Sequence, residues 1–236
     1  MKNYLKYILL SLLIMFLTAC GGEPKHIKSP IDIMIKEMGN EPVYDIVLYD
    51  LEDNSGLFSS DYKHQYKIIK EKDSLMINNA GEELVQKIPY TITTPWYKVS
   101  KSFFKSHADN MGMVIASKDS TGKISKIPAP LGYSRYVGNS RYGHWGGGTW
   151  HFFSNYLFMR AMFGGGMFYR NNYNTYNSSY RGRQAYYGKT TTGSPKYGTK
   201  SSAMQKRINS GTSKYRSGSR YRSSGSSRSR GGGFGK

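Results

Sequence analysis

The chain has 236 residues, a formal net charge of +19 at pH 7 and a single cysteine. One cysteine cannot form a disulfide within the chain, so the fold must be held together by its hydrophobic core. The length allows one or two domains, and so positive a charge favours an anionic partner.

The positive charge is concentrated in the second half of the chain. Residues 1–119 hold all 15 acidic residues and 14 of the 34 basic ones, whereas residues 120–236 hold 20 basic residues and no acidic one. Such an asymmetry is typical of a nearly neutral folded module followed by a cationic segment.

The N-terminus has the three-part layout of a secretory signal. Lys2 and Lys6 precede an apolar run over residues 7–17, and the sequence Leu17-Thr18-Ala19-Cys20 follows. The run is short for a membrane-spanning helix. Its Leu-Thr-Ala-Cys ending resembles the lipobox of the bacterial lipoprotein class. That resemblance implies a signal peptide over residues 1–19, cleavage before Cys20, and lipidation of Cys20. An uncleaved signal anchor with an incidental cysteine is the alternative.

We expect residues 20–28 to form a lipid-anchored tether and residues 29–130 to form an α+β domain. Ser29-Pro30-Ile31-Asp32 is a helix start with a capping residue, and Gly39 ends the apolar periodicity that follows it. Segments rich in β-forming residues then alternate with turn residues as far as Ile127, which predicts a small, mostly antiparallel sheet. Thr94-Pro95 predicts a second helix that carries Trp96, Val99 and Phe103 on one face.

The turn Asp119-Ser120-Thr121-Gly122 lies between two segments that we expect to be strands, residues 111–116 and 123–127. Glycine readily supplies the positive φ that a tight turn needs, so these segments are predicted to form a hairpin. We expect five or six strands in this domain.

Residues 131–166 form a segment rich in glycine and aromatic residues. Two Gly-Gly-Gly triplets, at 146–148 and 164–166, bracket an apolar stretch for which we predict a helix over residues 149–163, capped by Thr149. Such a helix would pack on the α+β domain, take part in self-association, or lie in the membrane interface. The tripeptide Ser-Arg-Tyr occurs at 134–136, 140–142 and 219–221, which is weak evidence for a repeat.

Residues 167–236 are rich in Arg, Tyr, Gly and Ser and poor in aliphatic residues, so we expect a disordered basic tail. Its composition resembles the Arg-Gly and Arg-Ser tails of single-strand RNA-binding proteins. Arginine donors match phosphate and carboxylate groups in geometry. The residues expected to bind an anionic partner are Arg181, Arg183, Arg216, Arg220, Arg222, Arg228 and Arg230.

No pattern in the sequence names a catalytic set, a metal site or a cofactor site. His107 and Asp109 could be a base and the residue that orients it, but two residues apart in a polar turn they are more typical of a surface or capping pair. His144 and His151 could meet around the glycine-rich loop and bind a metal, but they lack i, i+4 spacing and no acid follows Asp119 to complete a site. We therefore expect no enzyme activity, no cofactor and no metal.

The sequence favours a non-enzymatic, lipid-anchored cell-envelope protein. We expect its module to bind or scaffold a protein partner, and its tail to engage an anionic envelope polymer or lipid headgroups. The location would be the outer membrane of a Gram-negative cell, or otherwise the outer face of the cell membrane. Surface capture of nucleic acid and an enzyme with an unrecognised site remain as alternatives.

Overall fold

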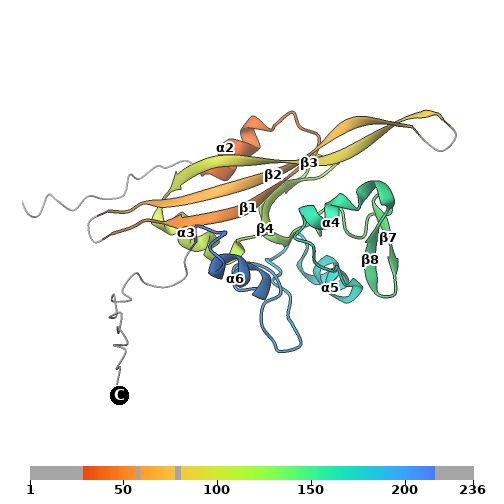
Figure 1. Cartoon of the computed structure of the whole chain (residues 1–236). Coiled ribbons are helices and arrows are strands. Elements are labelled where there is room, and N and C mark those ends of the chain that lie inside the picture. The colour runs from red at the N-terminus through yellow and green to blue at the C-terminus, as the bar shows by residue number, and fades with distance from the viewer. Residues whose placement is uncertain (1–28, 57–58, 78–80, 216–236) are drawn as a thin grey trace, which may run out of the picture.

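The computed structural model describes residues 29–56, 59–77 and 81–215 (Figure 1). The main sheet has six strands, in the order β3-β2-β1-β4-β5, with β6 also paired to β4. All of these strand pairs are antiparallel. The expected α+β class with a mostly antiparallel sheet is confirmed. The strands of this sheet are β1 (Tyr44–Asp53), β2 (Tyr62–Ile77), β3 (Glu83–Val99), β4 (Met113–Lys118), β5 (Ile124–Ser125) and β6 (Ala129–Pro130).

A separate two-stranded hairpin and several short helices complete the described part of the chain. The hairpin consists of β7 (Gly143–Gly146) and β8 (Thr149–Phe152). The helices are α2 (Pro30–Glu37), α3 (Lys101–His107), η1 (Ala108–Asn110), η2 (Ser154–Tyr156), α4 (Phe158–Met162), α5 (Arg170–Thr175), the π-helical turn η3 (Tyr176–Tyr180) and α6 (Ser202–Asn209). Among the described residues, no helix has the length and apolar character needed to cross a membrane.

The first predicted helix is confirmed as α2. Pro30 occupies its first turn, and the Asp32 backbone N–H donates to Ser29 Oγ at 3.4 Å, as expected of an N-cap. The hairpin between β4 and β5 is confirmed too. Its turn glycine, Gly122, has a φ of +83°, and the Asp119 carboxylate accepts from the backbone of Thr121 and Lys123.

The helix predicted at Thr94-Pro95 is wrong, because β3 runs through this dipeptide and α3 begins only at Lys101. Proline has no backbone N–H for the ladder, and the β2–β3 register shifts between Gln65 and Lys67, opposite this point. There the Tyr66 N–H donates instead to Thr94 Oγ1 at 3.0 Å. The Thr94 hydroxyl therefore accepts the backbone hydrogen bond of Tyr66 on β2 at the point where the β2–β3 register shifts.

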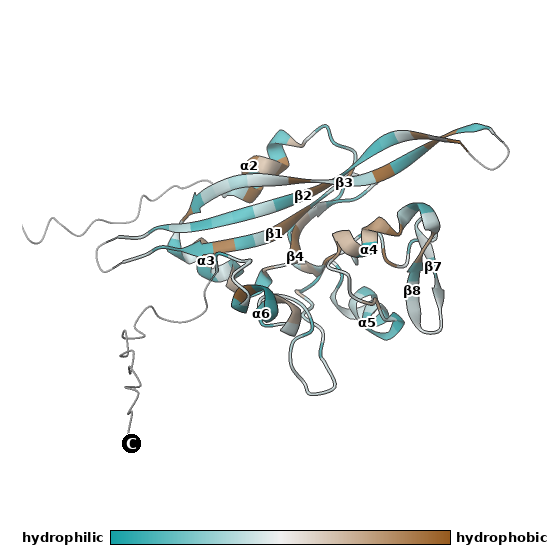
Figure 2. Ribbon diagram, in the orientation of Figure 1, coloured by the Kyte–Doolittle hydropathy of each residue, from teal (hydrophilic) through white to brown (hydrophobic). Residues whose placement is uncertain are grey.

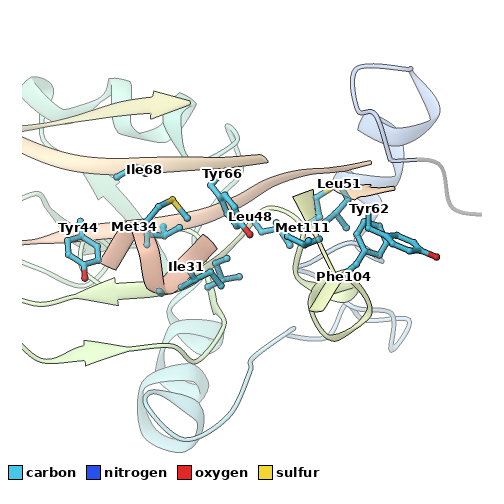
Figure 3. Packing of buried hydrophobic residues seen from close by; sticks show 14 of the residues in the cluster. Ile31, Met34, Tyr44, Leu48, Leu51, Tyr62, Tyr66, Ile68, Phe104 and Met111 are labelled. Atoms are coloured by element: carbon cyan, nitrogen blue, oxygen red, sulfur yellow. The ribbon is translucent and has the colours of Figure 1, made fainter. Parts of the chain in front are cut away.

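One core lies between one face of the sheet and helices α2, α3 and α6 (Figure 3). Tyr44, Ile46 and Leu48 alternate along β1 and all point into this core with no exposed surface. Met34 of α2 and Phe104 of α3 cover them. The central position of β1 explains why nearly all of its residues are buried.

A second core lies on the other face of the sheet, where Val47, Ile69 and Val114 meet the glycine- and tyrosine-rich chain. Aromatic rings supply most of its volume, including Tyr133 and Tyr136, which are 1% and 0% exposed. Residues 131–166 therefore pack onto the sheet as a second layer.

The predicted helix over residues 149–163 is wrong, because this segment contains β8, then η2, then the five-residue α4. Gly147 and Gly148 both have positive φ, which is the requirement of a two-residue hairpin turn. Trp150 and Phe152 are buried and His151 between them is exposed, so the pattern follows the two-residue period of a strand.

The expectation of disorder from residue 167 onward is wrong for residues 167–215. Phe168, Tyr176, Tyr186 and Ile208 are each at most 8% exposed and belong to the two cores. Aliphatic residues are scarce here, but tyrosine and phenylalanine bury large apolar areas in their place. Residues 216–236, where disorder was also predicted, lie outside the described residues, as do the whole signal peptide and the whole tether.

The β2–β3 hairpin extends beyond the rest of the sheet as an arm (Figures 1 and 2). The pairing of β1 with β2 ends at Tyr44 and Lys70, whereas β2 and β3 remain paired as far as Ile77 and Glu83. Exposed apolar side chains lie along the arm: Leu75, Ile77, Leu84 and Val85.

Candidate anion-binding pocket

A buried carboxylate on β1 lies beside the candidate site. Asp45 points to the same face of the sheet as Val47, away from the α2 core, and is completely buried. Ser134, which follows β6, places its hydroxyl 3.2 Å from both carboxylate oxygens of Asp45. Burial raises the pKa of Asp45 above its ordinary value, and the nearby Arg135 charge acts in the opposite direction.

The next residue, Arg135, forms a buried ion pair with Glu71 of β2. Its Nη2 lies 2.7 Å from Glu71 Oε1, and the two side chains are only 9% and 7% exposed. Tyr142 also donates to Glu71 Oε1, at 2.8 Å, and Arg135 Nη2 donates to the Tyr136 hydroxyl at 2.6 Å. The other terminal nitrogen of Arg135, Nη1, is buried and has no hydrogen-bond partner among the described residues.

A pocket of about 270 Å³ opens beside this network, between the β4–β5 hairpin and the residues that follow η3. Three basic residues are among those that line it: Lys123, Arg135 and Arg181. The other lining residues are Ser117, Asp119, Ser125, Ile127, Pro128, Ala129, Ser134, Tyr176 and Gly182. The pocket therefore combines positive charge with several hydroxyl groups.

Two hydrogen bonds position the Arg181 guanidinium in the pocket wall. Its Nη2 donates to the Ser134 carbonyl oxygen at 3.0 Å, and its Nη1 donates to Asn177 Oδ1 at 3.1 Å. Neither contact neutralises the guanidinium, because both acceptors are uncharged. Lys123 likewise pairs with no acid among the described residues.

The one acid in the pocket wall, Asp119, is held by its own turn. Its Oδ1 accepts from the Thr121 N–H at 2.9 Å and the Lys123 N–H at 3.0 Å. The Thr121 hydroxyl bond is the main cause that lowers the pKa of Asp119. Tyr176, also in the wall, has its pKa raised to about 12 by burial, so it stays a neutral hydroxyl at pH 7. The lowered pKa keeps Asp119 ionised at pH 7, so the wall sets one carboxylate against Lys123, Arg135 and Arg181, and these basic residues can donate hydrogen bonds to an anion.

The structure separates the predicted anion-binding residues. Arg181 and Arg183 are both exposed, but Arg181 lines the pocket, whereas Arg183 does not and donates to the Ser178 carbonyl oxygen at 3.2 Å. Cys20 and the remaining predicted arginines lie outside the described residues: Arg216, Arg220, Arg222, Arg228 and Arg230.

The structure separates one of the two sequence pairs that contain histidine and brings the other pair together. His107 Nδ1 lies 3.0 Å from the Phe103 carbonyl oxygen, whereas Asp109 forms an ion pair with Lys200 at 3.1 Å, so the two side chains have different partners. His144 and His151, by contrast, are direct cross-strand partners in the β7–β8 hairpin.

Sequence analysis missed Asp45, Glu71, Ser134 and Arg135. Two signals pointed to them. Asp45 is an acid inside an otherwise apolar run, where it would be buried, and Ser134-Arg135-Tyr136 is the first copy of the repeated tripeptide. The second copy contributes Tyr142, so the repeat brings two tyrosines and one arginine around Glu71. Lys123 carried no signal beyond its charge.

Comparison with protein-family models, with curated proteins and with solved structures found no match for this chain.

Proposed function

We propose that this chain is a non-enzymatic, lipid-anchored cell-envelope protein whose folded body binds anionic groups of the envelope. The observation that carries this proposal is the pocket with Lys123, Arg135 and Arg181 in its walls. Phosphate and carboxylate groups on a polymer or a lipid headgroup are the ligands that such donors match best.

The charge distribution of the folded body supports the proposal. Residues 120–215 contain 14 basic residues and no acid. Four of them form ion pairs with acids from the first half of the chain, and those four are Lys126, Arg135, Lys200 and Arg207. The positive surface that remains attracts an anionic polymer or membrane at long range, while the pocket holds one group at close range.

Membrane attachment would come from the lipid on Cys20, which lies outside the described residues. The anchor would raise the local concentration of the cationic body at the surface that carries its ligand. The outer membrane of a Gram-negative cell, or the outer face of another cell membrane, is the location consistent with this role. Both faces of the sheet are covered, but the projecting β2–β3 arm, with its exposed apolar side chains, remains available for a protein partner in the envelope.

A vesicle-binding experiment distinguishes the contribution of the folded body from that of the tail. The chain from residue 21 onward, without its lipid, is mixed with vesicles of neutral lipid containing or lacking phosphatidylglycerol. Three variants are compared with this parent chain. The pocket variant is Lys123→Gln/Arg181→Gln, and its charge-matched control outside the pocket is Arg183→Gln/Lys189→Gln. In the tail variant, the five arginines after residue 215 are changed to Gln.

We expect the pocket variant to bind anionic vesicles about tenfold or more weakly than the control does, since each basic residue near an anionic surface contributes about 1 kcal/mol. Equal losses in the pocket variant and its control would contradict a role for the pocket. Tighter binding to single-stranded oligonucleotide than to vesicles of matched charge would replace this proposal with nucleic-acid capture.

A further inference from the structure

The β7–β8 hairpin places two histidines side by side on its outer face. His144 and His151 are paired in register, and their rings are stacked with centroids 5.7 Å apart and planes inclined by 23°. Both residues are exposed. The Phe153 ring lies 5.7 Å from that of His144 on the same outer side.

The opposite face fixes the hairpin against the body of the protein. Side chains alternate along a strand, so Trp145 and Trp150 lie on the other side from the histidines. Trp150 and Phe152 are buried in the aromatic core, and the two indole rings pack with centroids 5.1 Å apart. Arg170 stacks on Trp145 and so belongs to that inner face. The two histidines therefore lie on a hairpin whose other face is packed against the aromatic core.

Gly146 leaves the space next to both imidazoles open. A Cβ atom built at this glycine would lie 3.5 Å from His151 Nε2 and 3.8 Å from His144 Nε2. Both Nε2 atoms therefore lie within 4 Å of one point beside the hairpin backbone. Because the two rings are stacked and nearly parallel, rotation about the side-chain bonds would have to turn both nitrogens toward a common ion.

His151 Nε2 is already placed by its neighbours. It lies 3.2 Å from the Gly146 carbonyl oxygen and 3.0 Å from Thr149 Oγ1. A neutral imidazole carries one proton, and moving that proton to Nδ1 frees the Nε2 lone pair for a metal.

We propose that His144 and His151 together bind one divalent transition-metal ion through their Nε2 atoms. Imidazole ligands suit copper, nickel and zinc, and the affinity of such sites rises toward Cu²⁺. Metal–nitrogen bonds of about 2.0–2.1 Å are typical of zinc. No group of three or more His, Cys, Asp or Glu side chains gathers within the described ranges, so water or a small ligand would complete the coordination.

The test is a titration of the full mature chain with NiCl₂ and CuCl₂, followed by calorimetry and, for copper, by electron paramagnetic resonance. The variants are His144→Gln, His151→Gln and the double variant. His26→Gln removes one imidazole elsewhere in the chain and serves as the control. The fluorescence of Trp145 and Trp150 reports whether each variant keeps the hairpin packed.

We expect one ion per chain and nitrogen hyperfine coupling from two imidazoles. Each single variant should lose at least about tenfold in affinity, and the control should lose nothing, because chelation requires both rings at once. Affinity within twofold of the parent chain in either single variant overturns the proposal. A stoichiometry of one ion per two chains overturns it as well, since the site would then lie between molecules.

Discussion

Arg135 and Glu71 form a buried ion pair, with Nη2 and Oε1 2.7 Å apart, that joins the glycine- and tyrosine-rich layer to strand β2. Tyr142 donates to the same Glu71 oxygen. The pair lies beside the pocket, because Arg135 is also one of its lining residues. Glu71 thus holds in place a cation on which the candidate site depends.

Removing one member of this pair should be costly. We predict that Glu71→Gln lowers the free energy of unfolding by about 3 kcal/mol, because it breaks the buried ion pair and leaves only the buried Asp45 carboxylate near the Arg135 charge. The double variant Arg135→Met/Glu71→Leu should recover most of that loss. Urea denaturation of the three proteins measures both effects. A loss below 0.5 kcal/mol in Glu71→Gln would show that the pair is solvated.

His64 should make stability depend on pH. Burial, and secondarily the charge of His107, lower the pKa of His64 to about 3 from 6.5. The unfolded chain therefore binds more protons between these values, so this contribution is fully present above pH 6.5 and is lost as the pH falls toward 3. We predict a slope of up to about 1.4 kcal/mol per pH unit in this window. His64→Gln should flatten it, and an unchanged slope in that variant would assign the effect to other groups.

Phe168 and Tyr169 provide a matched test of whether residues 167–215, which contain no acidic residue, pack on the sheet. Phe168 is 7% exposed and packs in the aromatic core, whereas Tyr169 is 42% exposed and lies under Lys196. We predict that Phe168→Ala lowers the free energy of unfolding by about 3 kcal/mol and Tyr169→Ala by less than about 1 kcal/mol. Thermal or urea unfolding measures the difference. Equal, negligible effects would mean that this region does not pack on the sheet.

Gly198 and Gly193 test how the loop before α6 docks. Both have positive φ, near +81° and +83°, but a Cβ at Gly198 would overlap the Asp109 carbonyl oxygen, whereas one at Gly193 would meet nothing within 4 Å. Gly193→Ala should therefore cost only the backbone strain of about 1–2 kcal/mol. Gly198→Ala should cost distinctly more. Similar unfolding free energies for the two variants would contradict the docked position of this loop on η1.

The features that sequence analysis predicted correctly depend on local signals. The α2 cap at Ser29 and the glycine turn at Gly122 each need only a few adjacent residues. The apolar segment after Gly148 was misassigned because its composition suits a helix equally well, and the decision comes from packing of Trp150 and Phe152 against the sheet. The order of residues 167–215 was missed because buried tyrosine replaces the aliphatic residues by which a core is usually recognised.

The pocket could not be predicted for a different reason. Ser134 contacts Asp45 across 89 residues, and Arg135 contacts Glu71 across 64. Contacts this distant are fixed by the topology of the sheet, which periodicity alone does not give. Of the basic residues predicted to bind an anion, Arg181 reaches the pocket through its bond to the Ser134 carbonyl oxygen.

The most direct test of an anion-binding pocket compares two arginines two residues apart. Calorimetric titration with glycerol phosphate, a soluble stand-in for lipid headgroups and phosphate polymers, is carried out on the mature chain and on its Arg181→Gln and Arg183→Gln variants. Both variants lose one charge, but only Arg181 lines the pocket. We predict that Arg181→Gln weakens binding by about fivefold or more, in keeping with about 1 kcal/mol per engaged cation, while Arg183→Gln leaves it within twofold. Equal affinities for the two variants, or no binding by the parent chain, would contradict the account.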